Sequence, residues 1–112
     1  MDTDVWQAKI RDFAQDREWE GFHTPKNLTM ALVGEAAELM EIFQWLTPDE
    51  SIGVMSGPQA YAVRDEVADV MTYLLRLVDV LGIDLDQAMS AKSSANAERY
   101  TIERSKGSAR KW

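Results

Sequence analysis

The fold is decided by residues 28–46, which read LTMALVGEAAELMEIFQWL. Apolar side chains recur in this stretch at alternating intervals of four and three residues, the spacing of one face of an α-helix. Residues 63–80 repeat the pattern. One acidic residue interrupts each apolar stripe, Glu35 in the first and Glu66 in the second. The stripes are Leu28, Leu32, Glu35, Leu39, Ile42 and Leu46, then Val63, Glu66, Val70, Tyr73, Leu77 and Val80.

An unpaired carboxylate that faces a protein core costs several kcal/mol, so it must be paired, protonated or bound to a cation. Glu38 and Asp69 lie one helical turn after Glu35 and Glu66, and few basic residues lie nearby. A single pair of this kind is typical of a solvated helix face. Two pairs whose first acids both occupy apolar stripes instead predict a metal site.

The available ligands indicate which metal is expected. The chain contains no cysteine and a single histidine, so the site would be built from oxygen atoms. Oxygen ligands favour Mg²⁺, with Mn²⁺ as an alternative, over Zn²⁺ or copper. Magnesium held by a few carboxylates keeps open positions that phosphate oxygens usually fill. The pattern therefore indicates an enzyme that hydrolyses phosphoanhydrides.

Helical patterns cover most of the chain, and no stretch alternates as a strand would. We expect an all-α, four-helix bundle-like subunit, with a loop at residues 47–58 that leaves room for a short turn inside it. Glycine, proline and capping residues set the expected helix ends. The expected helices run from about Asp2 or Thr3 to Trp19 (capped by Thr3 or Asp4), from Pro25 to about Trp45 (capped by Thr24), from about Gln59 to Leu81 (ending at Gly82), and from Leu85 to about Ile102 (capped by Asp84).

Composition narrows the class of protein. A net charge of −7 argues against binding to a nucleic-acid polymer or an anionic membrane. No segment has the ~20 continuous apolar residues of a membrane span, and no secretory signal is recognisable. The lack of cysteine fits a reducing cytoplasm. Four tryptophans in so short a chain favour a homodimer or larger assembly.

The acidic residues and their surroundings resemble a known family. The run Glu35-Ala-Ala-Glu38, followed after residues 39–65 by Glu66-Val-Ala-Asp69, is similar to the signature of MazG-type nucleotide pyrophosphohydrolases, which are all-α NTP pyrophosphatases. Stretches between Phe13 and Lys111 resemble the dCTP pyrophosphatase branch of that family. They comprise Arg17-Glu-Trp19, Phe22-His23, Pro25, Asn27, residues 31–35, Phe43-Gln-Trp45, Lys92, Asn96, Arg99-Tyr100 and residues 108–111.

This resemblance implies Mg²⁺-dependent hydrolysis of a nucleoside triphosphate to the monophosphate and pyrophosphate, by a homodimer or homotetramer. We expect a MazG-like helical catalytic domain at residues 1–104, and the polar, glycine-containing residues 105–112 predict a flexible basic tail. Ile10 departs from the branch, because a mammalian relative has a histidine there. The implied roles are metal ligands at Glu35, Glu38, Glu66 and Asp69 (with Glu35 or Glu38 as catalytic base), base contacts at Trp19, Trp45, His23 and Asn27, a sugar contact at Tyr73, and phosphate contacts at Lys92, Asn96 and Arg99.

Other interpretations of these residues stay open at this point. Trp19 and Trp45 could be core or interface residues, and His23 could cap a turn. Lys92 and Arg99 could be ordinary solvated charges. The alternative for the whole chain is a non-catalytic helical module that binds a nucleotide or a protein around a structural cation.

Overall fold

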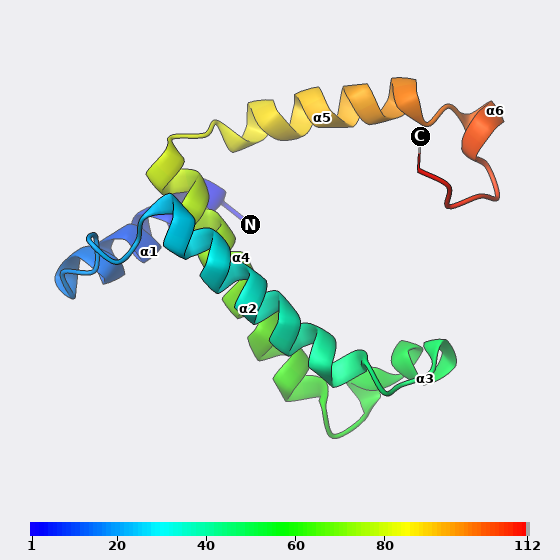
Figure 1. Ribbon diagram of the computed structural model, residues 1–112, viewed down its shortest axis with the longest axis horizontal. Coiled ribbons are helices and arrows are strands. Elements are labelled where there is room, and N and C mark those ends of the chain that lie inside the picture. Colours follow the sequence, from blue (N-terminus) through cyan, green and yellow to red (C-terminus); the bar gives the residue numbers. More distant parts are fainter. Residues whose placement is uncertain (112) are drawn as a thin grey trace. The chain divides into compact units, whose positions relative to one another are not determined.

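A computed structural model describes residues 1–111. These residues form helices joined by short loops and contain no strand, which confirms the predicted all-α class (Figure 1). No helix among them is long and apolar enough to cross a lipid bilayer. The elements are α1 (Thr3–Asp16), α2 (Pro25–Phe43), α3 (Pro48–Ile52), the 3₁₀ turn η1 (Val54–Ser56), α4 (Ala60–Leu81), α5 (Leu85–Arg99) and α6 (Ile102–Ser105).

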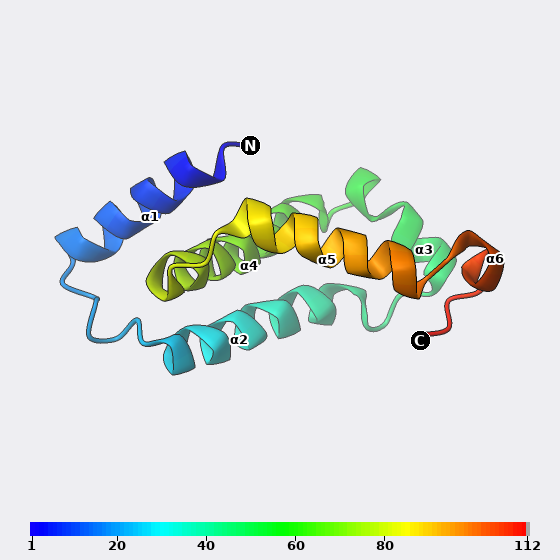
Figure 2. The ribbon, with the colours of Figure 1, turned by 90° about the horizontal axis from the view of Figure 1, so that it is seen from above.

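The chain divides after Gly82 into two compact units. In the first unit, α4 is the central helix, with α2 packed along one side and α1 along another (Figure 2). The second unit holds α5 and α6. The predicted division into residues 1–104 and 105–112 stays a prediction, and its last residue lies outside the described range.

Because two helices cover α4, it buries residues on two faces. Val63 belongs to the predicted stripe and is buried. Leu75 and Val78 lie off that stripe and are also buried. On α2, Leu28 is almost inaccessible to solvent, and on α1 the same is true of Ala14. The core therefore lies where α1 and α2 meet α4.

The first helix is shorter than expected. It ends at Asp16 instead of Trp19, and Asp2 caps it instead of Thr3 or Asp4, through bonds from the Asp4 and Val5 amides. The early end has a local cause. Glu18 adopts a left-handed conformation (φ 55°), and the Trp19 amide bonds back to the Ala14 carbonyl. This is the usual C-terminal helix motif, here built without the glycine that normally signals it.

Three other boundaries differ from the predicted ones. Helix α2 ends at Phe43, two residues before Trp45. The predicted loop at residues 47–58 contains α3 and η1, because Thr47 and Glu50 cap each other's backbone amides as a capping box. The predicted fourth helix is interrupted at Tyr100, so α5 ends at Arg99 and the single turn α6 follows. The Thr24 and Asp84 caps and the stop at Gly82 are confirmed.

Two glycines should respond oppositely to alanine. Gly82 has a φ of 64°, which strains any side chain, so Gly82→Ala should lower the free energy of unfolding by about 1 kcal/mol. Gly34 lies inside α2, and a Cβ there would meet nothing within 4 Å. Gly34→Ala should therefore raise the same free energy by about 0.8 kcal/mol. Urea denaturation measures both, and equal signs for the two variants would contradict the assigned backbone conformations.

Candidate functional site

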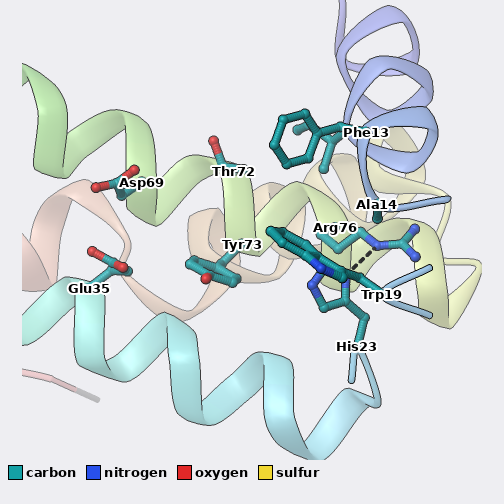
Figure 3. Close-up of a pocket in the computed structure, with 10 residues that line it drawn as sticks. Phe13, Ala14, Trp19, His23, Glu35, Asp69, Thr72, Tyr73 and Arg76 are labelled. Atoms are coloured by element: carbon teal, nitrogen blue, oxygen red, sulfur yellow. Dashed lines mark hydrogen bonds between the residues drawn. The ribbon is translucent and has the colours of Figure 1, made fainter. Parts of the chain in front are cut away.

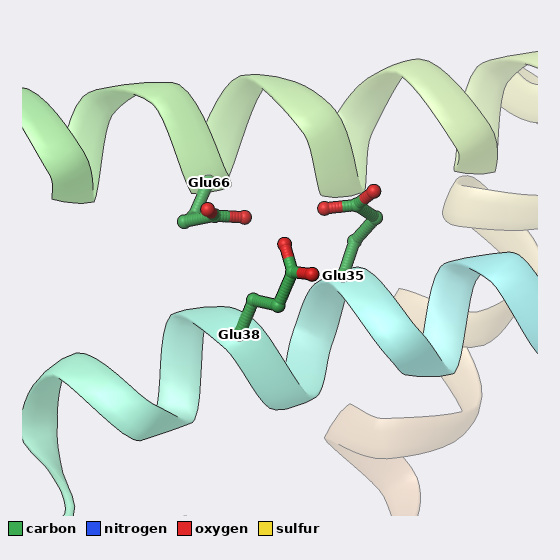
Figure 4. A group of neighbouring side chains, drawn as sticks. All are labelled: Glu35, Glu38 and Glu66. Carbon is green, nitrogen blue, oxygen red and sulfur yellow. The ribbon is translucent and has the colours of Figure 1, made fainter.

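Three of the predicted acidic residues converge between α2 and α4. Glu35 and Glu38 extend from α2 toward α4, and Glu66 extends from α4 toward α2 (Figure 4). One carboxylate oxygen from each lies within 4.8 Å of the others. The fourth acid, Asp69, lies one turn along α4 and faces Glu35 across the adjacent pocket (Figure 3).

The electrostatics of this acidic cluster favour the binding of a cation. The Oε2 atoms of Glu35 and Glu66 are buried, and neither has a hydrogen-bond partner within residues 1–111. Burial, together with hydrogen bonding to Glu38 and the charges of Glu38 and Asp69, raises the pKa of Glu35 to about 7. Burial and the charge of Glu38 also raise the pKa of Glu66. Orphaned carboxylate oxygens in an oxygen-only cluster fit a hard divalent cation such as Mg²⁺.

A pocket of about 190 Å³ adjoins the acids. Its two ends differ in chemistry. Glu35 and Asp69 lie at one end, Trp19 and His23 lie at the other, and Tyr73 lies between them (Figure 3). Such a pocket suits a ligand with a flat aromatic group and an anionic chain. The full lining is Ile10, Phe13, Ala14, Trp19, His23, Glu35, Asp69, Thr72, Tyr73 and Arg76.

The aromatic end is built by the loop that follows α1. The rings of Phe13 and Trp19 meet edge to face at 5.7 Å, and those of Trp19 and His23 do so at 5.8 Å. The turn around Glu18 directs the chain so that Trp19 and His23 reach the pocket. Trp19 remains 40% exposed, so part of its surface is open to a ligand.

Two predicted base contacts lie elsewhere. The Asn27 side chain donates to the Phe22 carbonyl at 3.1 Å, so it braces the loop before α2 and does not line the pocket. Trp45 follows the C-terminal end of α2, a helix about 28 Å long that begins near the pocket. Its side chain is 87% exposed and does not line the pocket.

The predicted phosphate contacts belong to the second unit. Lys92, Asn96 and Arg99 are exposed along α5, at the spacing that gives one helix face. The Arg99 guanidinium lies 5.8 Å from the centre of the Tyr100 ring. Glu41, a further acid on α2, is exposed and lies outside the acidic cluster.

Arg76 is the pocket residue that the sequence reasoning missed. It is 6% exposed and pairs with Asp79 on the same helix. A signal was present, because residues 71–81 are apolar apart from Thr72, Tyr73 and this arginine–aspartate pair. Charges of opposite sign, spaced by three residues inside an apolar run, indicate a buried ion pair.

The fold and the acidic cluster together define a class of all-helical proteins with converging carboxylates between two helices. A model of the MazG-like family matches residues 31–112, a range that includes all four acids. The chain therefore belongs to the MazG-like family, which confirms the resemblance seen in its acidic motifs.

Similar proteins agree with this assignment. The chain is 44% identical over 107 residues to dCTP pyrophosphatase 1 of Bos taurus and 40% identical to that of Homo sapiens. These matches cover 90% of the chain but only 60% of the length of each relative. A crystal structure of a pyrophosphatase from Archaeoglobus fulgidus is 37% identical, with a TM-score of 0.83 over 90% of this chain and 94% of that one.

Proposed function

We propose that this chain is a Mg²⁺-dependent pyrophosphohydrolase that cleaves a nucleoside triphosphate, of the dCTP type, between its α and β phosphates. The observation that carries the proposal is the pair of buried oxygens of Glu35 and Glu66, which have no hydrogen-bond partner within residues 1–111 and lie beside an aromatic pocket. The relatives named as dCTP pyrophosphatases support the substrate class. Such an activity would control a nucleotide pool or remove unwanted nucleotides in the cytoplasm.

The four acids would hold the cation, which when bound would offset phosphate charge and make a bound water more acidic. Glu35 or Glu38 would accept a proton from the attacking water. The water oxygen would form a new bond to phosphorus while the bond to the α–β bridging oxygen breaks, which yields the monophosphate and pyrophosphate. Trp19 would stack on the base, and stacking of this kind contributes about 1–3 kcal/mol.

We also propose that the active form is a homodimer or homotetramer. Apolar side chains remain uncovered on the single chain, including Met30 and Val33 on α2 and Val67 on α4. Burying such surface is the usual reason for assembly. Since Trp45 lies far from Trp19 within one chain, a base that contacts both would need a second copy. A single-chain mass from light scattering would contradict this assembly.

In the assembled enzyme, Lys92, Asn96 and Arg99 would bind the phosphates. A lysine and an arginine on one face of α5 match the charge of a triphosphate. The basic residues of the predicted tail would add to this charge.

A panel of deoxynucleoside and ribonucleoside triphosphates tests the proposed activity. With Mg²⁺, we expect the monophosphate and pyrophosphate in equal amounts, dCTP to be among the best substrates, and EDTA to stop the reaction. Chromatography of the products measures all three. If nucleotides bind but no triphosphate releases pyrophosphate with Mg²⁺ or Mn²⁺, the alternative of a non-catalytic nucleotide-binding module is correct.

A further inference from the structure

A buried arginine contacts the single histidine of this chain. The Nε atom of Arg76 donates a hydrogen bond to Nδ1 of His23 at 3.1 Å (Figure 3). A guanidinium has only donors, so the nitrogen that accepts this bond cannot carry a proton. A neutral imidazole with an unprotonated Nδ1 must carry its proton on Nε2.

Arg76 is itself held in place from two helices. Its Nη1 atom lies 3.2 Å from Oδ2 of Asp79, one turn further along α4. Arg11 of α1 approaches the same carboxylate with Nε at 2.8 Å and Nη2 at 2.5 Å. These contacts keep the pKa of Asp79 below its ordinary value, led by the hydrogen bond from Arg11. The guanidinium that faces His23 is therefore fixed by an ion-pair network that also joins α1 to α4.

The other ring nitrogen of His23 is not enclosed by protein. His23 lines the pocket and is half-buried. Within the described residues, its Nε2 atom makes no hydrogen bond and is not enclosed by protein. Burial and the positive charge of Arg76 lower the pKa of His23, against an opposing effect of Glu20, so the ring is neutral near pH 7. The imidazole thus offers the pocket one N–H group and no acceptor.

We propose that Arg76 is a positioning residue, which holds His23 as an Nε2–H donor so that the pocket selects a base edge that offers hydrogen-bond acceptors. Cytosine presents two adjacent acceptors, its ring N3 and its O2, whereas uracil and thymine carry a proton on N3. A fixed donor at His23 that meets the N3 position therefore favours cytosine over uracil and thymine. The ligand in this proposal rests on the proposed function, while the tautomer of His23 does not.

Nitrogen NMR of the whole protein tests the tautomer directly, because the chain has one histidine and needs no assignment. We expect wild-type His23 to show the Nε2–H pattern near pH 7. In Arg76→Met the Nδ1–H form should appear beside it. Arg64→Met is the matched control, since Arg64 is an exposed arginine of α4 that lies over Tyr61. Wild-type His23 in the Nδ1–H form would overturn the proposal.

A second variant guards against loss of fold in Arg76→Met. Arg11→Met removes the partly exposed end of the network and leaves the His23–Arg76 contact in place. It should give the same change in His23 to a smaller extent, because the Asp79 carboxylate that holds Arg76 is then no longer fixed by Arg11. A His23 spectrum unaffected in both variants would show that the network does not set the tautomer, and would overturn the proposal.

Binding experiments test the role of the donor. Adding dCMP should shift the His23 Nε2–H signal, whereas 2-deoxyribose 5-phosphate, which lacks a base, should not. In turnover of dCTP, Arg76→Met should raise KM about tenfold and change kcat less than about twofold, because a neutral hydrogen bond to the base is made equally in ground and transition states. A loss in kcat alone, or no response to dCMP, would overturn the role in base selection.

This test separates the two proposals. If no triphosphate is hydrolysed but His23 is an Nε2–H donor that responds to dCMP, the proposed activity fails and the positioning role of Arg76 stands. If pyrophosphate is released but wild-type His23 carries its proton on Nδ1, the proposed activity stands and the positioning role of Arg76 fails.

Discussion

Glu38→Gln and Asp69→Asn should each reduce the rate of pyrophosphate release by at least about 100-fold. Each change removes one negative charge from the proposed cation site and leaves side-chain size almost unchanged. A bound metal ion contributes several kcal/mol to hydrolysis of this kind, and every 1.36 kcal/mol is a factor of ten in rate. Steady-state rates of pyrophosphate release at saturating Mg²⁺ give the comparison.

The fold should survive these changes. The charge of Glu38 raises the pKa of both Glu35 and Glu66, so in Glu38→Gln one source of repulsion is lost. Without metal, this variant should unfold at the same temperature as the wild type or a few degrees higher. Glu41→Gln is the matched control, because Glu41 lies on the same helix but outside the acidic cluster. Near-normal rates in both Glu38→Gln and Asp69→Asn would refute the assigned roles.

Magnesium should stabilise the protein strongly at pH 8 and much less at pH 5. At a concentration one hundred times its Kd, a ligand of the folded state raises the free energy of unfolding by about 2.7 kcal/mol. In a chain of this size, that corresponds to a rise in Tm on the order of 10 °C. At pH 5, protons compete with the cation for Glu35, because the pKa of Glu35 is raised to about 7. Calorimetry at both pH values measures the difference.

Without metal, the thermal stability of the protein should fall as the pH rises. Glu35 has an ordinary pKa of 4.5 when unfolded and about 7 when folded, so the folded chain holds more protons between these values. Its contribution to stability is therefore present below about pH 4.5 and is lost as the pH rises through 7. Glu66 acts in the same direction. In EDTA, the Tm should fall between pH 5 and 8. The lowered pKa of His23 acts in the opposite direction. A rise over that interval that persists in His23→Gln would show that the acids do not lie close together in solution.

Much of the fold could be predicted because the signals for its helices lie within short segments of the sequence. The stripes of α2 and α4, the Thr24 and Asp84 caps and the stop at Gly82 are properties of short segments. The end of α1 could not be predicted in this way. Glu18 takes the left-handed conformation in place of a glycine, and nothing in its own identity signals this. The stripe on α4 also identified only one of two buried faces, because the approach of α1 is a tertiary event.

The candidate site was predictable to the extent that its residues break a pattern. Glu35 and Glu66 interrupt apolar stripes, and the structure places them together with Glu38. Trp45 and Asn27 carry no such internal signal, since they were named only through the family resemblance, and neither lines the pocket of a single chain. Arg76 does break an apolar run. Its importance comes from contacts with His23 and Asp79, of which the first spans 53 residues of sequence.

Within its own unit, helix α5 obtains little stability from packing. All of its side chains after Leu85 are exposed, and a helix of 15 residues is only marginally stable in water by its own propensity. If other copies supply the missing contacts, dilution would melt this segment before the rest of the molecule. The cations at Lys92 and Arg99 would then be ordered only where protomers are abundant, so turnover per chain would increase with protein concentration.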